Sequence, residues 1–470
     1  MKKFKKIISL TLTVIIALLP LTTFAGAYFN QTQYEITSSY EGIDWDTWKA
    51  YKTQLHCHTN ASDGFLTVKE VVQKSYDAGY NAVAITDHGT VNRNWNEEPE
   101  LIPILRLVKY ERTQMADIIP LTDEEYQAYL NGTAETTNGA VREGGMIDIP
   151  KGIELNAATP VADCHLTGYY ADYGQGLIGV FGDYETPAEE VNKLGGLTML
   201  AHVGEYVYPD KDTEFHVGEK VDDYYANKFA RLFLDNAGSA VGMGINSATD
   251  AHTRCDRILY DQILLKTIPH GVVPWSFTFS DSHNAESINF AYTMHYMPEL
   301  NNDELRTSME NGTFFSVSHF SNGVELNGMR EMPEYIESEV DADSNDTPLV
   351  TRVDIDDDDD VITIDGINFD TVTWIADGEV IRRGGVEATS IDLGEYKIRN
   401  FVRFYITGED GICYSQPIVV NKEGTEHIKT IVPETNDIST FLRKLITILD
   451  KLLFSNSIIV DIFKDTALGY

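Results

Sequence analysis

Gln54-Leu55-His56-Cys57-His58-Thr59 is the segment from which the rest of the architecture can be worked out. Its apolar and polar residues alternate, as in a β-strand over 54–58. Side chains two apart on a strand point to the same side, so His56 and His58 share one face and Cys57 faces away. Two imidazoles on one face can hold a metal ion. Ser62-Asp63-Gly64 then predicts a tight turn that can bring a carboxylate over the strand end.

Residues 50–320 alternate short apolar runs with amphipathic helical patterns, which is typical of βα units. In the first unit, the capping box Thr67-x-x-Glu70 opens a helix. Polar residues follow each predicted strand: Asp87-His88 after 82–86, His202 after 197–201, and Asp281 and His283 after 272–279. The carboxyl ends of strands form the catalytic mouth of a β/α barrel, so the pattern predicts a site there.

Two further carboxylate and histidine positions lie between these strands. Glu154 stands in Gly152-Ile153-Glu154, and His165 stands in Cys164-His165-Leu166-Thr167-Gly168. A single histidine is more often packed or hydrogen-bonded than a metal ligand. The metal hypothesis therefore depends on the joint occurrence of these residues at strand ends. The Asp-x-His pattern of Asp281 and His283 also occurs in Thr249-Asp250-Ala251-His252. Asp250 and His252 therefore stay open as an alternative to Asp281 and His283.

The composition changes near residue 330. The run Asp356–Asp360 is acidic and indicates a solvated linker. Calcium binding by Asp341-x-Asp343-x-Asn345 is the alternative, although the glycine and the distal glutamate of an EF loop are missing. The predicted division is a signal peptide at 1–27, a barrel at 28–330 with an acidic insertion at 90–148, a linker at 331–360, an all-β sandwich-like domain at 361–425 and an amphipathic helical segment at 430–470.

The amino terminus has the pattern of an export signal. Four lysines precede the apolar run Ile7–Leu19, and Ala25-Gly26-Ala27 is a small-x-small cleavage site. We therefore expect a secreted or extracellular protein. An uncleaved membrane anchor is the alternative, and Pro20 together with the cleavage site argues against it.

The charge of the chain restricts its partners. There are 36 Lys and Arg against 73 Asp and Glu, a net charge of −37. Such a surface repels long nucleic acids and anionic membranes, so a small substrate is expected at a local positive centre. Weak association with the cell surface through the C-terminal segment is a further expectation.

Four cysteines are too few for a disulfide framework in a chain of this length. Two of them, Cys57 and Cys164, adjoin proposed ligand histidines, so a metal role is conceivable. Because Cys57 points away from its neighbours on a strand, ordinary buried thiols are the better prediction, and this extends to Cys255 and Cys413.

The motifs Leu55-His56-Cys57-His58-Thr59, Ser62-Asp63-Gly64 and Ile85-Thr86-Asp87-His88 resemble the opening of the PHP domain, the polymerase and histidinol phosphatase superfamily. The resemblance continues in the family's order through Glu154, His165, His202 and Asp281-Ser282-His283, over about residues 50–320. It implies an α/β fold, a distorted (β/α)7 barrel, here followed by the sandwich-like domain and C-terminal helices. It also implies phosphoester hydrolysis at a site that usually holds three metal ions.

Carried over by motif, the resemblance assigns nine ligands. The first ion would be held by His56, His58, Glu154 and Asp281, the second by Glu154, His165 and His202, and the third by Asp63, His88 and His283. Val203 stands where the family usually has proline, which removes no ligand. Histidine and carboxylate ligands suit zinc, manganese and iron alike.

The ions would carry more positive charge than the three carboxylates neutralise, so the site should attract a phosphate. A hydroxide bridging two metals is the expected nucleophile. Glu154 as the bridge, with His88 and His283 near the leaving group, are the predicted catalytic residues. Arg254 and Arg257 are candidate phosphate clamps, with surface salt bridging as the alternative. Hydrolysis of an amide or lactone, or a non-catalytic surface protein that binds through the same barrel, are the competing functions.

Overall fold

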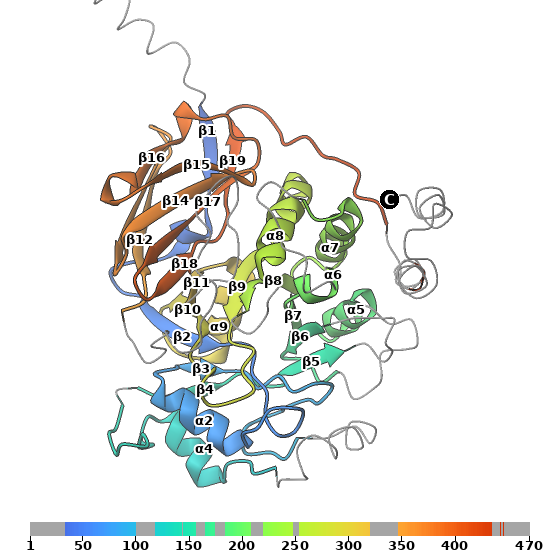
Figure 1. Ribbon diagram of the computed structural model, residues 1–470, viewed down its shortest axis with the longest axis vertical. Coiled ribbons are helices and arrows are strands. Elements are labelled where there is room, and N and C mark those ends of the chain that lie inside the picture. Colours follow the sequence, from blue (N-terminus) through green and yellow to red (C-terminus); the bar gives the residue numbers. More distant parts are fainter. Residues whose placement is uncertain are drawn as a thin grey trace, which may run out of the picture.

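The computed structural model describes most of the chain between residues 33 and 434 (Figure 1). The described ranges are 33–99, 118–142, 144–156, 165–173, 184–207, 220–247, 253–319 and 346–434, with the single positions 442 and 445. The predictions for the signal peptide, for Cys164, for Asp250 and His252, for the calcium motif and for most of the C-terminal segment lie outside these ranges. Within them, no helix is long and apolar enough to cross a membrane.

In the first sheet, β2 (Lys49–Gln54) lies between β3 (Ala82–Val83) and β10 (Ala291–Met297). β4 (Ile147–Asp148) pairs with β3, and β11 (Phe314–Ser318) pairs with β10. β2, β3 and β4 are parallel, whereas β10 runs antiparallel to β2. Helix α9 (Asn302–Asn311) connects β10 to β11.

Helix α2 (Val68–Asp77) begins with the predicted Thr67–Glu70 capping box. The described part of the acidic insertion includes α4 (Asp123–Leu130), which packs against α2 (Figure 1). There, the Tyr129 ring meets Tyr76 edge-on at 5.1 Å, and the Tyr129 hydroxyl donates to Gln73. This part of the insertion therefore extends the helical layer.

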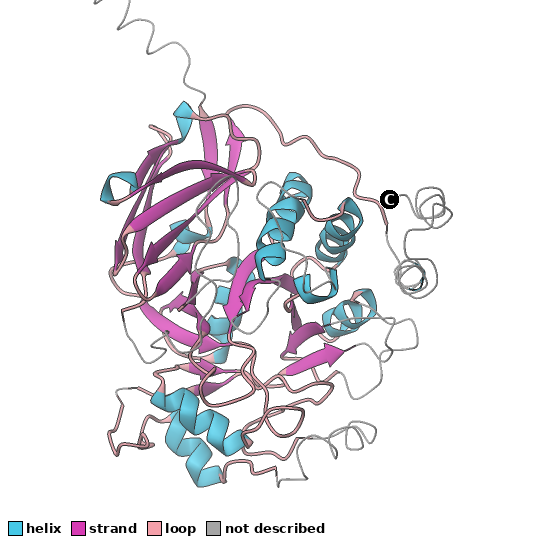
Figure 2. Ribbon diagram, viewed as in Figure 1, coloured by secondary structure: helices cyan, strands magenta, loops and turns pink. Residues whose placement is uncertain are grey.

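The second sheet contains β5 (Ile153–Asn156), β6 (His165–Tyr169), β7 (Leu197–Leu200), β8 (Ala240–Ser247) and β9 (Trp275–Phe279), in that order. β7, β8 and β9 are parallel, and β5 to β7 are antiparallel. Figure 2 shows helices gathered along this sheet: α5 (Glu185–Lys193), α6 (Gly204–Val207), α7 (Asp223–Asp235) and α8 (Thr253–Thr267).

The strands that the structure describes do not close into the single barrel that the resemblance implies. The strands from β2 to β11 fall in two sheets, which are linked by isolated bridges of Cys57 with Ser282 and of His88 with Glu154. β3 and β4 have only two residues each, so their ladders are too short to join the sheets. The connection is made instead within the predicted site motifs, because Cys57 and Ser282 each lie between two predicted ligands and His88 and Glu154 are predicted ligands themselves.

The C-terminal strands extend the first sheet. β18 (Gly411–Tyr414) pairs with β11, and β17 (Phe401–Gly408), β14 (Thr371–Ala376), β15 (Glu379–Gly384) and β19 (Ile418–Lys422) continue from it. β1 (Tyr34–Thr37), far away in the sequence, pairs with β19. A separate sheet contains β12 (Leu349–Asp356), β13 (Val361–Ile367) and β16 (Ser390–Asp392). Short 3-10 turns occupy Ser39–Gly42, Ile268–His270, Val386–Ala388 and Leu393–Glu395.

The aspartate run is part of this β structure, which corrects the linker prediction for residues 349–360. The chain there forms strand β12 and the turn into β13. Asp357 and Asp360 accept hydrogen bonds from the backbone N–H groups of Ile36 and Tyr34. A run of charges predicts a solvated linker, because charge alone does not show that the carboxylates hold a distant strand.

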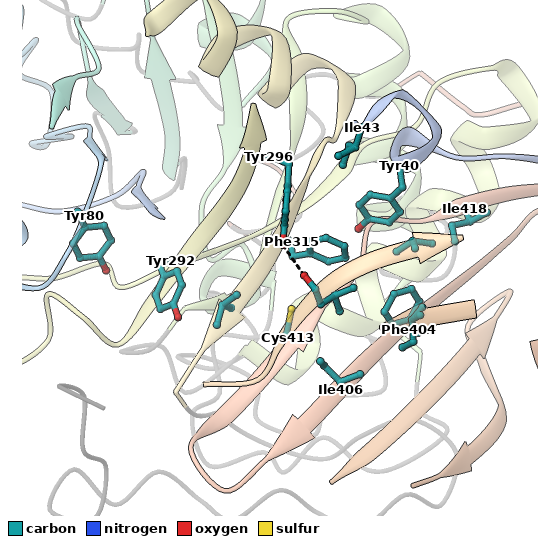
Figure 3. Close-up of a cluster of buried hydrophobic side chains, with 14 of the residues drawn as sticks. Tyr40, Ile43, Tyr80, Tyr292, Tyr296, Phe315, Phe404, Ile406, Cys413 and Ile418 are labelled. Atoms are coloured by element: carbon teal, nitrogen blue, oxygen red, sulfur yellow. Dashed lines mark hydrogen bonds between the residues drawn. The ribbon is translucent and has the colours of Figure 1, made fainter. Parts of the chain in front are cut away.

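One hydrophobic core spans β10, β11 and the C-terminal strands (Figure 3). Tyr292 and Phe315 of β10 and β11 belong to the same buried cluster as Phe404, Ile406 and Cys413. On the other side, Arg403 of β17 makes two hydrogen bonds of 2.7 and 2.8 Å to Asp261 of α8, and both residues are buried. The C-terminal strands are thus integrated with the rest of the described chain.

A buried histidine in β10 makes the stability of the protein dependent on pH. Burial lowers the pKa of His295 to about 3, and its ring contacts the hydroxyls of Ser308 and Thr293. The unfolded chain takes up this proton near pH 6.5 and the native protein does not, so stability should fall as the pH drops below 6.5. The expected loss is about 1.4 kcal/mol per pH unit from this residue.

Urea unfolding of the wild type and of His295→Gln between pH 7 and pH 5 measures this loss. The difference in slope between the two proteins isolates His295 from the other histidines. Equal slopes would show that His295 is not held neutral.

Candidate metal centre

His56 and His58 follow β2, because the strand ends at Gln54 and not at His58 as predicted. Their rings nevertheless lie together, 5.0 Å apart between centroids, and both are buried. Cys57 faces the other way and its thiol donates to the Ala84 carbonyl. Cys57, Cys255 and Cys413 are all buried, which agrees with the prediction for these three.

The turn after His58 brings Asp63 back to the histidines. A Cβ atom on Gly64 would lie 2.5 Å from the His58 carbonyl oxygen, so only glycine fits this return. The next residue, Phe65, donates its N–H to the His283 carbonyl at 2.8 Å. The Ser-Asp-Gly turn therefore joins the first motif to the last one.

Glu154 is the centre of the cluster. It is fully buried on β5, and both of its oxygens face imidazole nitrogens. Three nitrogens face Oε1: His165 Nδ1 at 2.6 Å, His202 Nε2 at 3.4 Å and His56 Nε2 at 3.6 Å. Two nitrogens face Oε2: His88 Nδ1 at 2.7 Å and His58 Nε2 at 3.4 Å.

Asp281 forms a second focus after β9. Its Oδ1 lies 3.1 Å from His58 Nε2 and 3.3 Å from His56 Nε2, and its Oδ2 lies 3.7 Å from His202 Nε2. Asp281 has a φ of 48° and His202 a φ of 25°, a backbone region that non-glycine residues rarely adopt. Strain at two adjacent cluster residues is typical of a site that the surrounding fold holds in place.

Asp63 forms the third focus. Its carboxylate lies 3.3 Å from His283 Nε2, 3.5 Å from His88 Nε2 and 3.6 Å from His58 Nδ1. The structure therefore brings all nine predicted ligands together, in overlapping groups whose donor atoms could hold metal ions. These groups are His58, Asp63, His88 and His283; His56, His58 and Glu154; His56, His202 and Asp281; and His88, Glu154 and His165.

The two candidate phosphate clamps lie on α8. Arg257 is buried and directly follows Asp256. The Asp256 carboxylate accepts a 2.6 Å hydrogen bond from the N–H of Gly204, which begins α6 shortly after His202. The side chain of Arg254 lies outside the described residues. The role of both arginines stays a prediction.

The histidines and carboxylates of the cluster shift one another's pKa values. Burial lowers the pKa of His56 to about 3. Burial acts to raise the pKa of Glu154, but His165 and His88 hold it well below its usual range. Burial acts to lower the pKa of His283, yet its hydrogen bond to Asp63 raises it to about 9. A metal ion would bind the unprotonated form of His283.

The donor set fits divalent metal ions. Buried carboxylates and imidazoles face one another, and His56 Nε2 makes no hydrogen bond to any part of the chain that the structure describes. Both Glu154 oxygens are likewise buried and without a hydrogen bond of good geometry among the described residues. Buried polar atoms without a hydrogen-bond partner need explanation in a native protein, and a cation between them provides one.

Asp87 is a residue whose importance the sequence did not reveal. It is fully buried and accepts hydrogen bonds of 2.7 Å from the Thr59 N–H, the Thr59 hydroxyl and the Ser62 hydroxyl, and one of 3.1 Å from Asn92. Its carbonyl accepts the N–H of Glu154. Its place directly before His88 was the only sequence signal.

We expect Asp87→Asn to weaken metal binding by about 10- to 100-fold, the usual effect of losing a partner behind the ligands. An amide cannot accept all four hydrogen bonds, so Ser62 would release its contact to His58 Nδ1, which is 3.2 Å long. Metal titration followed by calorimetry measures the change. Asp172→Asn, at a more exposed aspartate paired with Arg93, is the control; equal affinities for wild type and Asp87→Asn would contradict the role.

Phe279 forms an apolar wall beside the cluster. Its ring lies edge-on to His56 at 5.0 Å and is fully buried. A Cβ on Gly244 would come within 2.4 Å of that ring, so the glycine in β8 provides its space. This partner was also missed, because contact between β8 and the end of β9 depends on strand pairing.

Comparison with known proteins agrees with these motifs. Residues 54–236 match the family model of the PHP domain. The segment thus resembles the PHP domain, and the match together with the histidine and carboxylate groups supports a metal-dependent hydrolase. Asp281 and His283 lie beyond the matched segment, and the fold brings them to it.

Among curated proteins, a 5'-3' exoribonuclease of Haemophilus influenzae is 25% identical over 188 residues, which are 32% of this chain and 68% of that protein. A two-domain protein of Bacteroides vulgatus, described as containing a predicted PHP-like metal-dependent phosphoesterase, has 14% identity and a TM-score of 0.38, and the alignment covers 82% of this chain and 98% of that one. A putative metal-dependent phosphoesterase of Bifidobacterium adolescentis has 14% identity and a TM-score of 0.28, covering 50% and 88%. These TM-scores are too low for either structure to support an inference about this chain.

Proposed function

We propose that this protein is an exported, metal-dependent phosphoesterase that hydrolyses a small phosphate ester or nucleotide at a site for three metal ions. One observation carries the proposal: nine histidine and carboxylate side chains, scattered between residues 56 and 283, converge within overlapping ligand groups. A structural role alone does not account for so many titratable groups in a buried cluster.

The contacts support the assignment of ions that the motifs imply. His56 and His58 lie near both Glu154 and Asp281, which suits the first ion. His165 and His202 both face Glu154 Oε1, which suits a second ion bridged to the first. Asp63, His88 and His283 form the third group.

The ions would act as Lewis acids and lower the pKa of bound water to about 7. Glu154 would hold two of them at a fixed separation, because its oxygens face different imidazoles. His88 and His283, at the solvent-facing edge, would orient the phosphate side of the substrate. Arg254 and Arg257 are proposed to bind its oxygens.

The substrate is proposed to be small because the chain has a net charge of −37, which opposes a long polyanion. The relative from Haemophilus influenzae is named as an exoribonuclease, so short RNA belongs in the test. Export is proposed from the lysine-rich and apolar amino terminus.

The test is metal analysis of the purified full chain, together with hydrolysis assays on phosphomonoesters, mononucleotides and short RNA. His56→Ala is the variant expected to be inactive, since the His56 imidazole is fully buried among the proposed ligands. We expect metal-dependent hydrolysis of a small ester by the wild type alone. A metal-free wild type would contradict the metal centre. A metallated protein that cleaves amides or lactones, or nothing, would instead favour the competing hydrolase or a binding protein.

A further inference from the structure

The three ligand groups differ in their access to solvent. The side chains of Asp63, His88 and His283 are 24%, 22% and 30% exposed. Among the ligands around Glu154 and Asp281, the side chains of His56, His58 and Glu154 are 0% exposed, His202 is 4%, Asp281 13% and His165 20% exposed. The cluster thus has a more closed inner part around Glu154 and Asp281, with His165 at its edge, and a more open outer group of Asp63, His88 and His283.

We propose that the outer group binds an exchangeable metal ion, whereas the inner groups retain theirs, so that activity follows the free metal concentration. This inference rests on the proposed three-ion function. Water and buffer ions reach exposed ligands, and the attraction between a cation and a carboxylate weakens as the local dielectric rises. Asp63 is the one carboxylate within the outer group, although His88 Nδ1 also lies 2.7 Å from Glu154 Oε2, whereas Glu154 and Asp281 both face the inner histidines.

The inner ligands are also more firmly held. His56 Nδ1 contacts the Thr86 hydroxyl at 2.7 Å, which leaves Nε2 directed at the carboxylates. His58 contacts the Ser62 hydroxyl, which Asp87 fixes in turn. Partners behind the ligands increase metal affinity, so the inner ions should leave last.

The outer group is nevertheless prepared to take up an ion again. His283 Nδ1 contacts its own loop at the Asp281 carbonyl, 2.9 Å away, so that Nε2 faces Asp63. Phe65 joins the loop of Asp63 to the loop of His283 through a backbone hydrogen bond. Loss of the outer ion therefore leaves its ligands in position, and rebinding does not require folding.

The experiment uses the full chain saturated with Mn²⁺ and equilibrated at decreasing buffered free Mn²⁺, with bound manganese per chain measured by mass spectrometry. We expect one ion to leave at a free concentration at least about tenfold above that at which the other two leave. His283→Ala and Asp63→Asn should lack this first step. His202→Ala, the inner comparison, should keep it. Thermal melting verifies that each variant is folded.

The inference is overturned if all ions leave in one step, if saturation gives fewer than three ions, or if the first step persists in both outer variants. Two-step release from a protein that hydrolyses no phosphate ester would support the inference and contradict the proposed function. Recovery of hydrolysis in step with the return of the outer ion would support both.

Discussion

Glu154→Gln is expected to reduce phosphoester hydrolysis by more than about a hundredfold while the protein stays folded. Losing a partner behind a metal ligand already costs about 10- to 100-fold, and Glu154 is the proposed bridging ligand itself. Glutamine has nearly the same shape, so the packing around β5 can be retained. What disappears is the negative charge between His165, His88 and the buried pair His56 and His58.

Steady-state kinetics and metal content should be measured together for this variant. We expect fewer bound ions than in the wild type, and the remaining activity should not recover fully with added metal. Glu190→Gln, at an exposed residue paired with Lys193, makes the same chemical change away from the cluster and should leave activity unchanged. A fully metallated and active Glu154→Gln protein would exclude the bridging role.

A chain ending at residue 345 is expected to be insoluble or unfolded, although it contains every proposed ligand. The truncation removes β18, so Ser316, Val317 and Ser318 of β11 lose their strand partners. It also leaves Asp261 buried without Arg403. Removing one partner of a buried ion pair costs about 3–5 kcal/mol, a large part of the 5–15 kcal/mol by which domains are usually stable.

The lost packing adds to this effect, because Phe315 and Val317 share a buried cluster with Phe404 and Ile406 (Figure 3). The measurements are the soluble fraction after expression and the cooperativity of thermal melting. A chain ending at residue 434 keeps every described strand and serves as the control. If the shorter chain is soluble and melts cooperatively, the PHP-like part folds independently and the shared core is not required.

The sequence alone predicted the alternation of strands and helices and the members of the histidine and carboxylate cluster. Both follow from local rules: side chains two apart share a face of an extended segment, and polar residues after buried strands collect at one end of the fold. The capping box at Thr67 and the orientation of Cys57 are local in the same sense, and the structure agrees with both.

Only the tertiary structure decided how the strands pair and what holds the ligands. β18 joins β11, and β1 joins β19, through hydrogen bonds between segments far apart in the sequence, so no periodicity within a segment could reveal them. The strands expected to form the distorted barrel fall in two sheets among the described residues, and the aspartate run forms part of β12 and the turn into β13. Asp87 and the Gly244–Phe279 contact acquire their importance in the same way, because hydrogen bonds and packing depend on which chain segments the fold places side by side.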